Sequence, residues 1–259
     1  MRKLASCVPA LLIAGCSIDS LGSRQIAADQ PEATEVVRQE VNALPPGGLA
    51  SSGLTTVMLT PMSAAAMGIS QGARQVLAYA VGCALDSTQT ISFTVGGTTF
   101  TDSGGLGLAN GWTDDALSVT QAAWLSACVF AHANELSAVI WISLRGAQAE
   151  LETTSAERAE YQIEEGAFWG NAFVDLGPVA AYTCDGLTQP GSSDPDLESR
   201  QCAHWDGVAG SNQTPCGMGY AGLCRSVCTT ATPPYAGCSF LGQTASPVVI
   251  TTYLATPPG

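Results

Sequence analysis

Positive charge is scarce in this chain. Only nine of its 259 residues are lysine or arginine, and Lys3 is the single lysine. The 22 acidic residues bring the formal net charge to −13. Binding to a nucleic acid backbone or to an anionic lipid surface needs a cluster of cations. The composition therefore excludes a nucleic-acid partner.

Histidine and long apolar runs are scarce as well. The two histidines, His132 and His204, are too few for a three-histidine metal site. The apolar run at residues 4–13 is too short to cross a bilayer, because a spanning helix needs roughly 20 residues. Apolar residues nevertheless make up 46% of the chain and charged residues only 12%. This balance argues against disorder in the body of the chain.

The first sixteen residues have the pattern of an export signal. Two cationic residues at positions 2 and 3 precede the apolar run, which ends in Ile13-Ala14-Gly15 and is followed directly by Cys16. A positive start, a short apolar stretch and a small-residue end are typical of a secretory signal peptide. The sequence Ile13-Ala14-Gly15-Cys16 resembles the lipobox of bacterial lipoproteins. An ordinary signal peptide without a lipid is the alternative.

This resemblance implies how the protein is attached. In bacterial lipoproteins the signal peptide, here residues 1–15, is removed, and the new terminal cysteine, here Cys16, carries the lipid. Each buried methylene contributes about 0.8 kcal/mol, so two or three acyl chains give lasting anchoring to a membrane. By the same resemblance, Ser17 after the cysteine favours the outer membrane over the inner one. We therefore expect the protein in the cell envelope, facing the periplasm or the cell surface.

The remaining cysteines predict a disulfide framework. Ten cysteines become eight once Cys7 and Cys16 are set aside with the signal and the lipid, and an even number in an oxidising compartment predicts four disulfides. A zinc site is the alternative for the six cysteines that surround His204, but they contain no C-x-x-C pair and fit no common zinc finger or ribbon. We therefore expect no metal and no cofactor. The predicted disulfide residues are Cys83, Cys128, Cys184, Cys202, Cys216, Cys224, Cys228 and Cys238.

The order of strand-like and helix-like segments predicts one α+β domain. Residues 16–53 are expected to form a flexible tether, and residues 54–259 the globular domain. Within that domain, residues 185–246 are rich in Gly, Pro, Ser and Cys and are expected to be mostly loop. Strands and helices mix without a regular βαβ alternation, which favours a disulfide-stapled domain with a mixed or antiparallel sheet and a central buried helix.

Local patterns predict the individual elements. The central helix covers residues 119–133, which are apolar on nearly every side. Cys128 lies on this helix and Cys83 on another, so we expect them to form one bridge. Two strand-like runs around Gly96-Gly97 predict a hairpin with a two-residue turn. The other predicted helices cover residues 32–43, 70–85 and 155–162, and the other predicted strands cover residues 55–59, 138–144, 179–184 and 248–254.

Three short motifs have structural explanations that compete with the chemical ones. Residues 102–105, DSGG, resemble the nucleophile motif of chymotrypsin-like proteases, but both histidines follow the serine, and Asp, Ser and Gly are common in loops. Cys128 and His132 share a helical face and would form a nucleophilic pair only if the thiol were free. A partial calcium loop, or simply a solvated acidic loop, is formed by Asp194, Asp196 and Glu198.

The block EEGAFWGNAF at residues 164–173 is the best candidate for a ligand site. Ligand sites combine aromatic walls with a few fixed polar groups. Trp169 would be a stacking surface, partly exposed in a concave region, and Glu164, Glu165 and Asn171 would be polar contacts. A glycosidase needs two carboxylates about 5–10 Å apart across the bond, and the two adjacent glutamates diverge. The alternative is that the block is core architecture.

No motif in the chain outweighs its structural explanation, so we expect a binding or structural module rather than an enzyme. A carbohydrate or a protein at the cell envelope is the expected ligand, and the lipid is the expected contact with the membrane. The alternative is a carbohydrate-active hydrolase centred on residues 164–171. Residues 54–259 resemble no family of known function.

Overall fold

The computed structural model consists of two units, Met1–Glu32 and Ala33–Gly259, and every described residue lies in the second unit. The export signal, the predicted strand at 55–59 and the acidic loop at 194–198 lie outside the described residues. The structure describes residues 37–39, 71–95, 97–113, 117–133, 140–172, 180–186, 202–203, 205 and 207–255.

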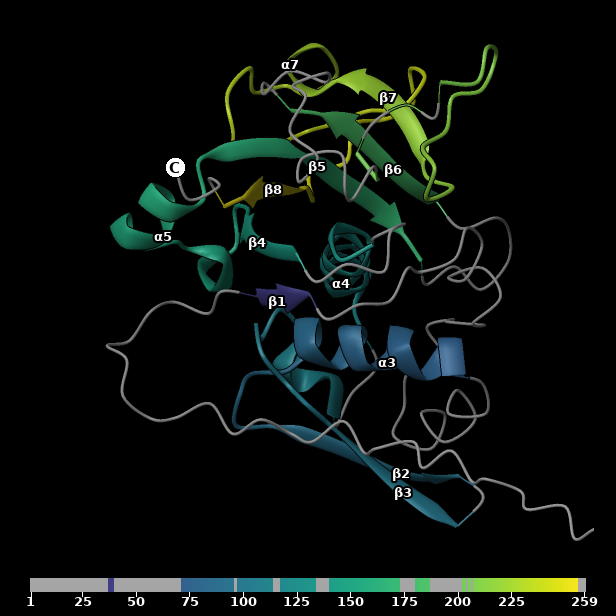
Figure 1. Ribbon diagram of the computed structural model, residues 1–259, viewed down its shortest axis with the longest axis vertical. Coiled ribbons are helices and arrows are strands. Elements are labelled where there is room, and N and C mark those ends of the chain that lie inside the picture. Colours follow the sequence, from purple (N-terminus) through teal and green to yellow (C-terminus); the bar gives the residue numbers. More distant parts are fainter. Residues whose placement is uncertain are drawn as a thin grey trace, which may run out of the picture. The chain divides into compact units, whose positions relative to one another are not determined.

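A six-stranded sheet forms the centre of the second unit (Figure 1). All neighbouring strands are antiparallel except β6 and β7, which are parallel. Together with the helices, this mixed sheet confirms the predicted α+β class. In spatial order the strands are β1 (Val37–Gln39), β4 (Ile140–Arg145), β8 (Ile250–Leu254), β5 (Ile163–Asn171), β6 (Ala180–Asp185) and β7 (Gly219–Leu223).

The edge strand β1 lies within the predicted tether. Val37 pairs with Ile142 and Gln39 pairs with Ile140, so the helix predicted over residues 32–43 is wrong at Val37–Gln39. The apolar residues recur there at helical spacing, but pairing with β4 satisfies the backbone and overrides this weak local preference. The sheet therefore includes residues that precede the predicted boundary at residue 54.

Two helices lie in succession on one side of the sheet, one packed against the sheet and the other packed against the first helix. Helix α4 (Val119–Ala131) begins with a capping box between Ser118 and Gln121 and is buried along most of its length, as the sequence predicts. It packs on β5, and the Ser126 hydroxyl accepts a hydrogen bond from the Ala172 amide at 2.8 Å. Helix α3 (Gln71–Ala84) packs against α4, and the predicted disulfide between Cys83 and Cys128 joins the two helices.

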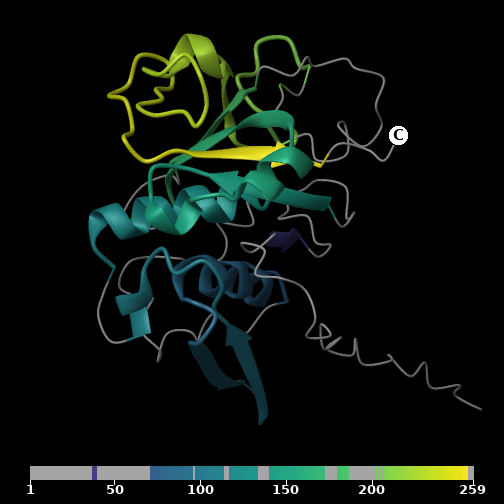
Figure 2. The same cartoon turned by 90° about the vertical axis from the view of Figure 1, so that its left-hand side faces the viewer.

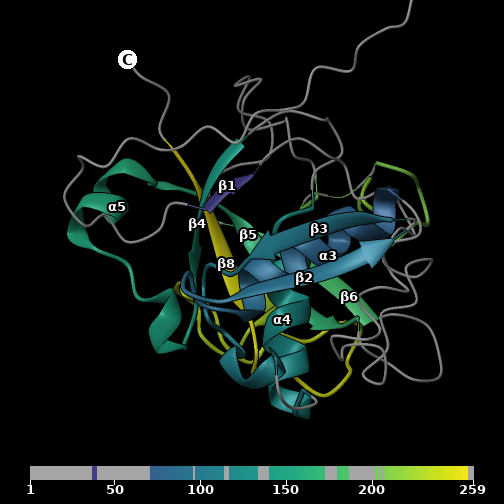
Figure 3. The ribbon, with the colours of Figure 1, turned by 90° about the horizontal axis from the view of Figure 1, so that it is seen from below.

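A separate hairpin packs beside α3, as Figure 3 shows from below. Its strands are β2 (Thr90–Val95) and β3 (Thr98–Ser103), and the pairing of Val95 with Thr98 confirms the predicted hairpin with a two-residue connection. Gly97 has a φ of 84°, a conformation that glycine adopts without steric cost. Among the other residues that the structure describes, the short helices are η2 (Asn110–Thr113), η3 (Ala149–Leu151), α5 (Ser155–Glu160) and α7 (Cys224–Val227).

The chain after β7 covers the opposite face of the sheet (Figure 2). We call the buried cluster on this face the smaller core; it consists of Ala167, Trp169, Cys184, Cys224, Tyr235, Cys238 and Val249. The larger core lies on the α4 side of the sheet and includes Phe168, Ile250 and most of α4. All eight predicted cysteines are paired, as Cys83–Cys128, Cys184–Cys224, Cys202–Cys216 and Cys228–Cys238.

Candidate functional site

The block at residues 164–171 forms β5, which lies in the sheet between β8 and β6. The sequence analysis predicts no strand there, because two adjacent glutamates and two glycines obscure the alternation that marks a half-buried strand. The strand is buried on both faces, by α4 on one side and by the smaller core on the other. This double cover decides the environment of every predicted site residue in the block.

Trp169 is buried, with only 2% of its surface exposed. Its ring lies 6.1 Å from the ring of Tyr182, which stacks on Phe240 at 4.6 Å. The expectation that Trp169 is partly exposed and offers a stacking surface is therefore wrong. The physical reason is that the chain after β7 returns across this face of the sheet and fills the space beside the indole.

Glu164 is also buried, and its carboxylate is held by a tyrosine. The Tyr235 hydroxyl donates a hydrogen bond of 2.7 Å to Oε1 of Glu164. Glu164 lies opposite Tyr253 on β8, and burial, followed by the Glu164 charge, raises the pKa of Tyr253 to about 12. The Arg145 guanidinium lies 3.6 Å from the centre of the Tyr253 ring and partly offsets this rise. Burial, followed by the hydrogen bond to Glu164, also raises the pKa of Tyr235, so this tyrosine is a neutral donor near neutral pH and stabilises the buried carboxylate.

Glu165 contacts a different residue on the other face of the sheet. The Thr252 hydroxyl donates a hydrogen bond of 2.7 Å to Oε2 of Glu165. Thr252 and Tyr253 are consecutive in β8 and point to opposite faces, so the two glutamates diverge as expected. Asn171 lies at the end of β5, half-buried, where it pairs with Ala180. The four predicted contact residues thus belong to one strand but do not surround one cavity.

The two glycines of the block permit close approach of a neighbouring strand. A Cβ at Gly170, where φ is 133°, would lie 1.9 Å from the Ala180 carbonyl oxygen. A Cβ at Gly166 would lie 2.4 Å from the Cys184 carbonyl oxygen. Both oxygens belong to β6, so the glycines accommodate this strand.

A shared arrangement explains the buried acids in this part of the chain. Each carboxylate accepts a hydrogen bond from a hydroxyl group that belongs to another element, which satisfies a polar group that burial would otherwise destabilise. Four such pairs tie neighbouring elements together: Glu164 with Tyr235, Glu165 with Thr252, Asp185 with Tyr220, and Glu157 with Ser143.

Glu157, like Asp185, is a member of this group that the sequence analysis misses. The motif SAERAE forms α5, and its charges are typical of an exposed helix, so no local signal marks one glutamate as buried. Oε1 accepts the Ser143 hydroxyl at 2.7 Å, while Oε2 is buried and has no hydrogen-bond partner. Burial raises the pKa of Glu157, although Ser143 and then Arg145 oppose this shift.

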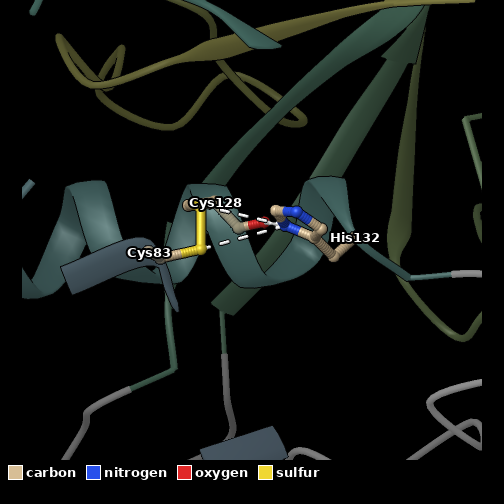
Figure 4. Close-up of side chains that lie close together, drawn as sticks. All are labelled: Cys83, Cys128 and His132. Carbon is tan, nitrogen blue, oxygen red and sulfur yellow. Dashed lines mark hydrogen bonds between the residues drawn. A yellow bond between two sulfur atoms is a disulfide. The ribbon is translucent and has the colours of Figure 1, made fainter. Parts of the chain in front are cut away.

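Cys83, Cys128 and His132 lie together between α3 and α4 (Figure 4). Nδ1 of His132 donates to the Cys128 carbonyl oxygen at 2.7 Å and lies 3.8 Å from both sulfur atoms. All three residues are buried. The disulfide leaves no thiolate on Cys128, so the contact with His132 is structural and the nucleophilic pair does not form in this state.

The DSGG motif at residues 102–105 begins at the end of β3. Ser103 is exposed and pairs with Thr90, while Asp102 is half-buried. Burial raises the pKa of Asp102, and the nearby Arg74 opposes the rise. The motif thus belongs to the end of the hairpin, which agrees with its structural explanation.

The chain was compared with family models, with curated proteins and with solved structures, and none of the three comparisons finds a match. Within the part of the chain that the structure describes, no helix is both long enough and apolar enough to cross a membrane. The four disulfides indicate an oxidising, extracytoplasmic environment.

Proposed function

We propose that this protein is a bacterial lipoprotein, anchored to a membrane outside the cytoplasm through Cys16, whose folded domain is a binding or structural module. The observation that carries this proposal is the complete pairing of the eight cysteines that follow residue 16. Disulfides form and persist in the compartment that an export signal leads to.

The two cysteines outside this framework support the same proposal. Cys7 and Cys16 both lie in the amino-terminal export pattern, and only Cys16 follows a complete apolar run and two small residues. The resemblance to a lipobox identifies Cys16 as the residue whose thiol would carry the lipid. Ser17 favours retention at the outer membrane, with the domain facing the periplasm or the cell surface.

The buried acids support a domain without catalysis. A hydrolase centred on residues 164–171 is the alternative, and it needs carboxylates that reach a substrate. Glu164 and Glu165 are 5% and 3% exposed, and each already accepts a hydroxyl hydrogen bond. Their roles fit the stabilisation of the sheet better than the cleavage of a glycosidic bond.

The proposed anchoring is tested by determining whether the Cys16 thiol is acylated. Mass spectrometry of the amino-terminal peptide should show Cys16 as the first residue, with its mass increased by acyl chains. Cys16→Ser should abolish both acylation and cleavage at this site, whereas the matched control Cys7→Ser should leave both unchanged. An unmodified Cys16 thiol in the mature protein would contradict the proposal.

The hydrolase alternative is tested by screening the purified protein against polysaccharides and peptides. We expect no turnover. Turnover that disappears in Glu165→Gln and persists in Glu160→Gln would establish the hydrolase instead. Glu160 is an exposed residue of α5 and serves as the control for a change of one charge.

A further inference from the structure

Two of the disulfides lie against each other in the smaller core. Cys184 on β6 is bonded to Cys224 at the start of α7, and Cys228, just after α7, is bonded to Cys238. The Sγ atoms of Cys184, Cys228 and Cys238 lie within 4.8 Å of one another, although they belong to two different bonds. Three of the four sulfur atoms therefore form one compact group, and the fourth, in Cys224, is bonded to Cys184, a member of that group.

We propose that these four cysteines form a Zn²⁺ site when both disulfides are reduced. Tetrahedral Zn²⁺ binds thiolates at about 2.3 Å, which places ligand sulfurs roughly 3.8 Å apart. In the oxidised protein the sulfurs of Cys184, Cys228 and Cys238 lie within 4.8 Å of one another, and the bonded pair Cys228–Cys238 must separate to reach this spacing. Cys224 is bonded to Cys184, so these two sulfurs must also separate once their bond opens. This site is independent of the lipid anchor.

A phosphine supplies the electrons for the reduction. In each disulfide, phosphorus attacks one sulfur and the S–S bond breaks; water then attacks phosphorus, which leaves as the phosphine oxide. The two sulfurs take the two hydrogens of that water molecule. Both disulfides together consume two phosphines and two waters and yield four thiols. Zn²⁺ then displaces the thiol protons to the buffer, because thiolate is the ligand.

The surroundings of the four cysteines suit a closed, structural metal site. Cys184, Cys224 and Cys238 are buried, and Cys228 is half-buried, so it provides the route of entry for the reductant and the ion. Trp169 and the other members of the smaller core shield the group from water. Four protein thiolates leave no open coordination position, which is the arrangement of structural rather than catalytic zinc.

The group around His132 is a poorer zinc site. It offers only three ligands, Cys83, Cys128 and His132, and all three are buried. Nδ1 of His132 already donates to the Cys128 carbonyl oxygen, so the imidazole would have to give up this hydrogen bond to bind an ion there. We therefore assign the Zn²⁺ site to the four cysteines of the smaller core.

The test uses the full chain, reduced with a phosphine and titrated with Co²⁺ and then with Zn²⁺. We expect one Co²⁺ per chain with the absorption of tetrahedral thiolate coordination, and its displacement by Zn²⁺. In the same reduced chain, Zn²⁺ should slow alkylation of the four cysteines by about tenfold or more, because the metal-bound state does not react. Alkylation of Cys202 and Cys216 should not change.

A matched pair of double variants completes the experiment. Cys184→Ala with Cys224→Ala should lose Co²⁺ binding, whereas Cys202→Ala with Cys216→Ala removes a disulfide elsewhere and should retain it. The proposal is overturned if the reduced chain binds no ion, if binding persists in the first variant or is lost in both, or if Zn²⁺ protects Cys83 and Cys128 instead.

Discussion

The two cores on either side of the sheet are stabilised in different ways. The larger core is built from two buried helices and the apolar residues of three central strands, so that apolar packing dominates. The smaller core has seven buried members, three of which are cysteines, and the chain that covers it is mostly loop. A small apolar cluster cannot order a long loop by itself, so covalent links contribute a larger share of its stability.

Reduction of the disulfides in the absence of metal should show the difference between the two cores most clearly. The bridges of the smaller core close 40 and 10 residues, and in the chain-entropy model they contribute about 4 and about 3 kcal/mol. Amide exchange in residues 224–249 should accelerate roughly hundredfold or more, while α4 stays protected by its packing. Hydrogen exchange with a chelator present measures both regions, and equal acceleration in α4 would contradict the comparison.

Phe168 and Trp169 provide a matched pair, because they are consecutive in β5 and face different cores. In the oxidised protein, Phe168→Ala and Trp169→Ala should each lower the free energy of unfolding by about 3–5 kcal/mol. After reduction without metal, Phe168→Ala should lower the free energy of unfolding by the same amount as before. Trp169→Ala should then lower it by about 1 kcal/mol or less, because the chain after β7 that covers Trp169 has opened. Denaturant titrations of the wild type and both variants, each oxidised and reduced, measure the difference, and an equal cost of Trp169→Ala in the two states would refute the distinction.

Alanine substitutions at two glycines compare the close contact between β5 and β6 with a position in helix α3 of the larger core. Gly170→Ala should destabilise the protein by about 3 kcal/mol, because the new methyl group meets the Ala180 carbonyl and φ is 133°. Gly82→Ala in α3 meets no atom within 4 Å and should stabilise by about 0.5–1 kcal/mol. Thermal unfolding of both variants decides the signs, and destabilisation by Gly82→Ala would mean that α3 tolerates no added side chain.

The smallest effect concerns the pH dependence that Glu157 contributes. Burial raises its pKa in the folded state, so folding favours the protonated form. Stability from this group is present below the unfolded pKa and is lost as the pH rises through the folded pKa. Glu157→Gln keeps a neutral side chain and should flatten the stability profile over that range, with a gain at pH 7. Unfolding titrations between pH 4 and pH 8 measure this, and an unchanged profile would contradict it.

The elements that the sequence predicts well are those with strong local signals. Helix α4 has a capping box and a long apolar stretch, and the Gly96-Gly97 hairpin has turn chemistry between two alternating runs. Strand β1 is mispredicted because four apolar residues at helical spacing, Ala33, Val37, Val41 and Leu44, are a weak signal, which the pairing with β4 overrides. Strand β5 is missed because its glutamates and glycines hide a core strand.

In the candidate site too, local signals predict some features, and contacts between distant segments decide the others. Glu165, Trp169 and Asn171 lie on one strand, and the burial of Trp169 depends on how the distant residues 224–249 fold over β5. No local pattern contains that information. The buried position of Glu157 likewise depends on Ser143, fourteen residues earlier in the chain.

By itself, the sequence determined the α+β class, the main helices, the hairpin, the set of eight paired cysteines and the Cys83–Cys128 bridge. These follow from local periodicity, turn residues and the even number of cysteines, which require no knowledge of distant contacts. Only the tertiary structure decided the strand order, the other three pairings and the contact between two disulfides around Cys184. Eight cysteines allow 105 connectivities, and it is the folding of separate segments against each other that selects one of them.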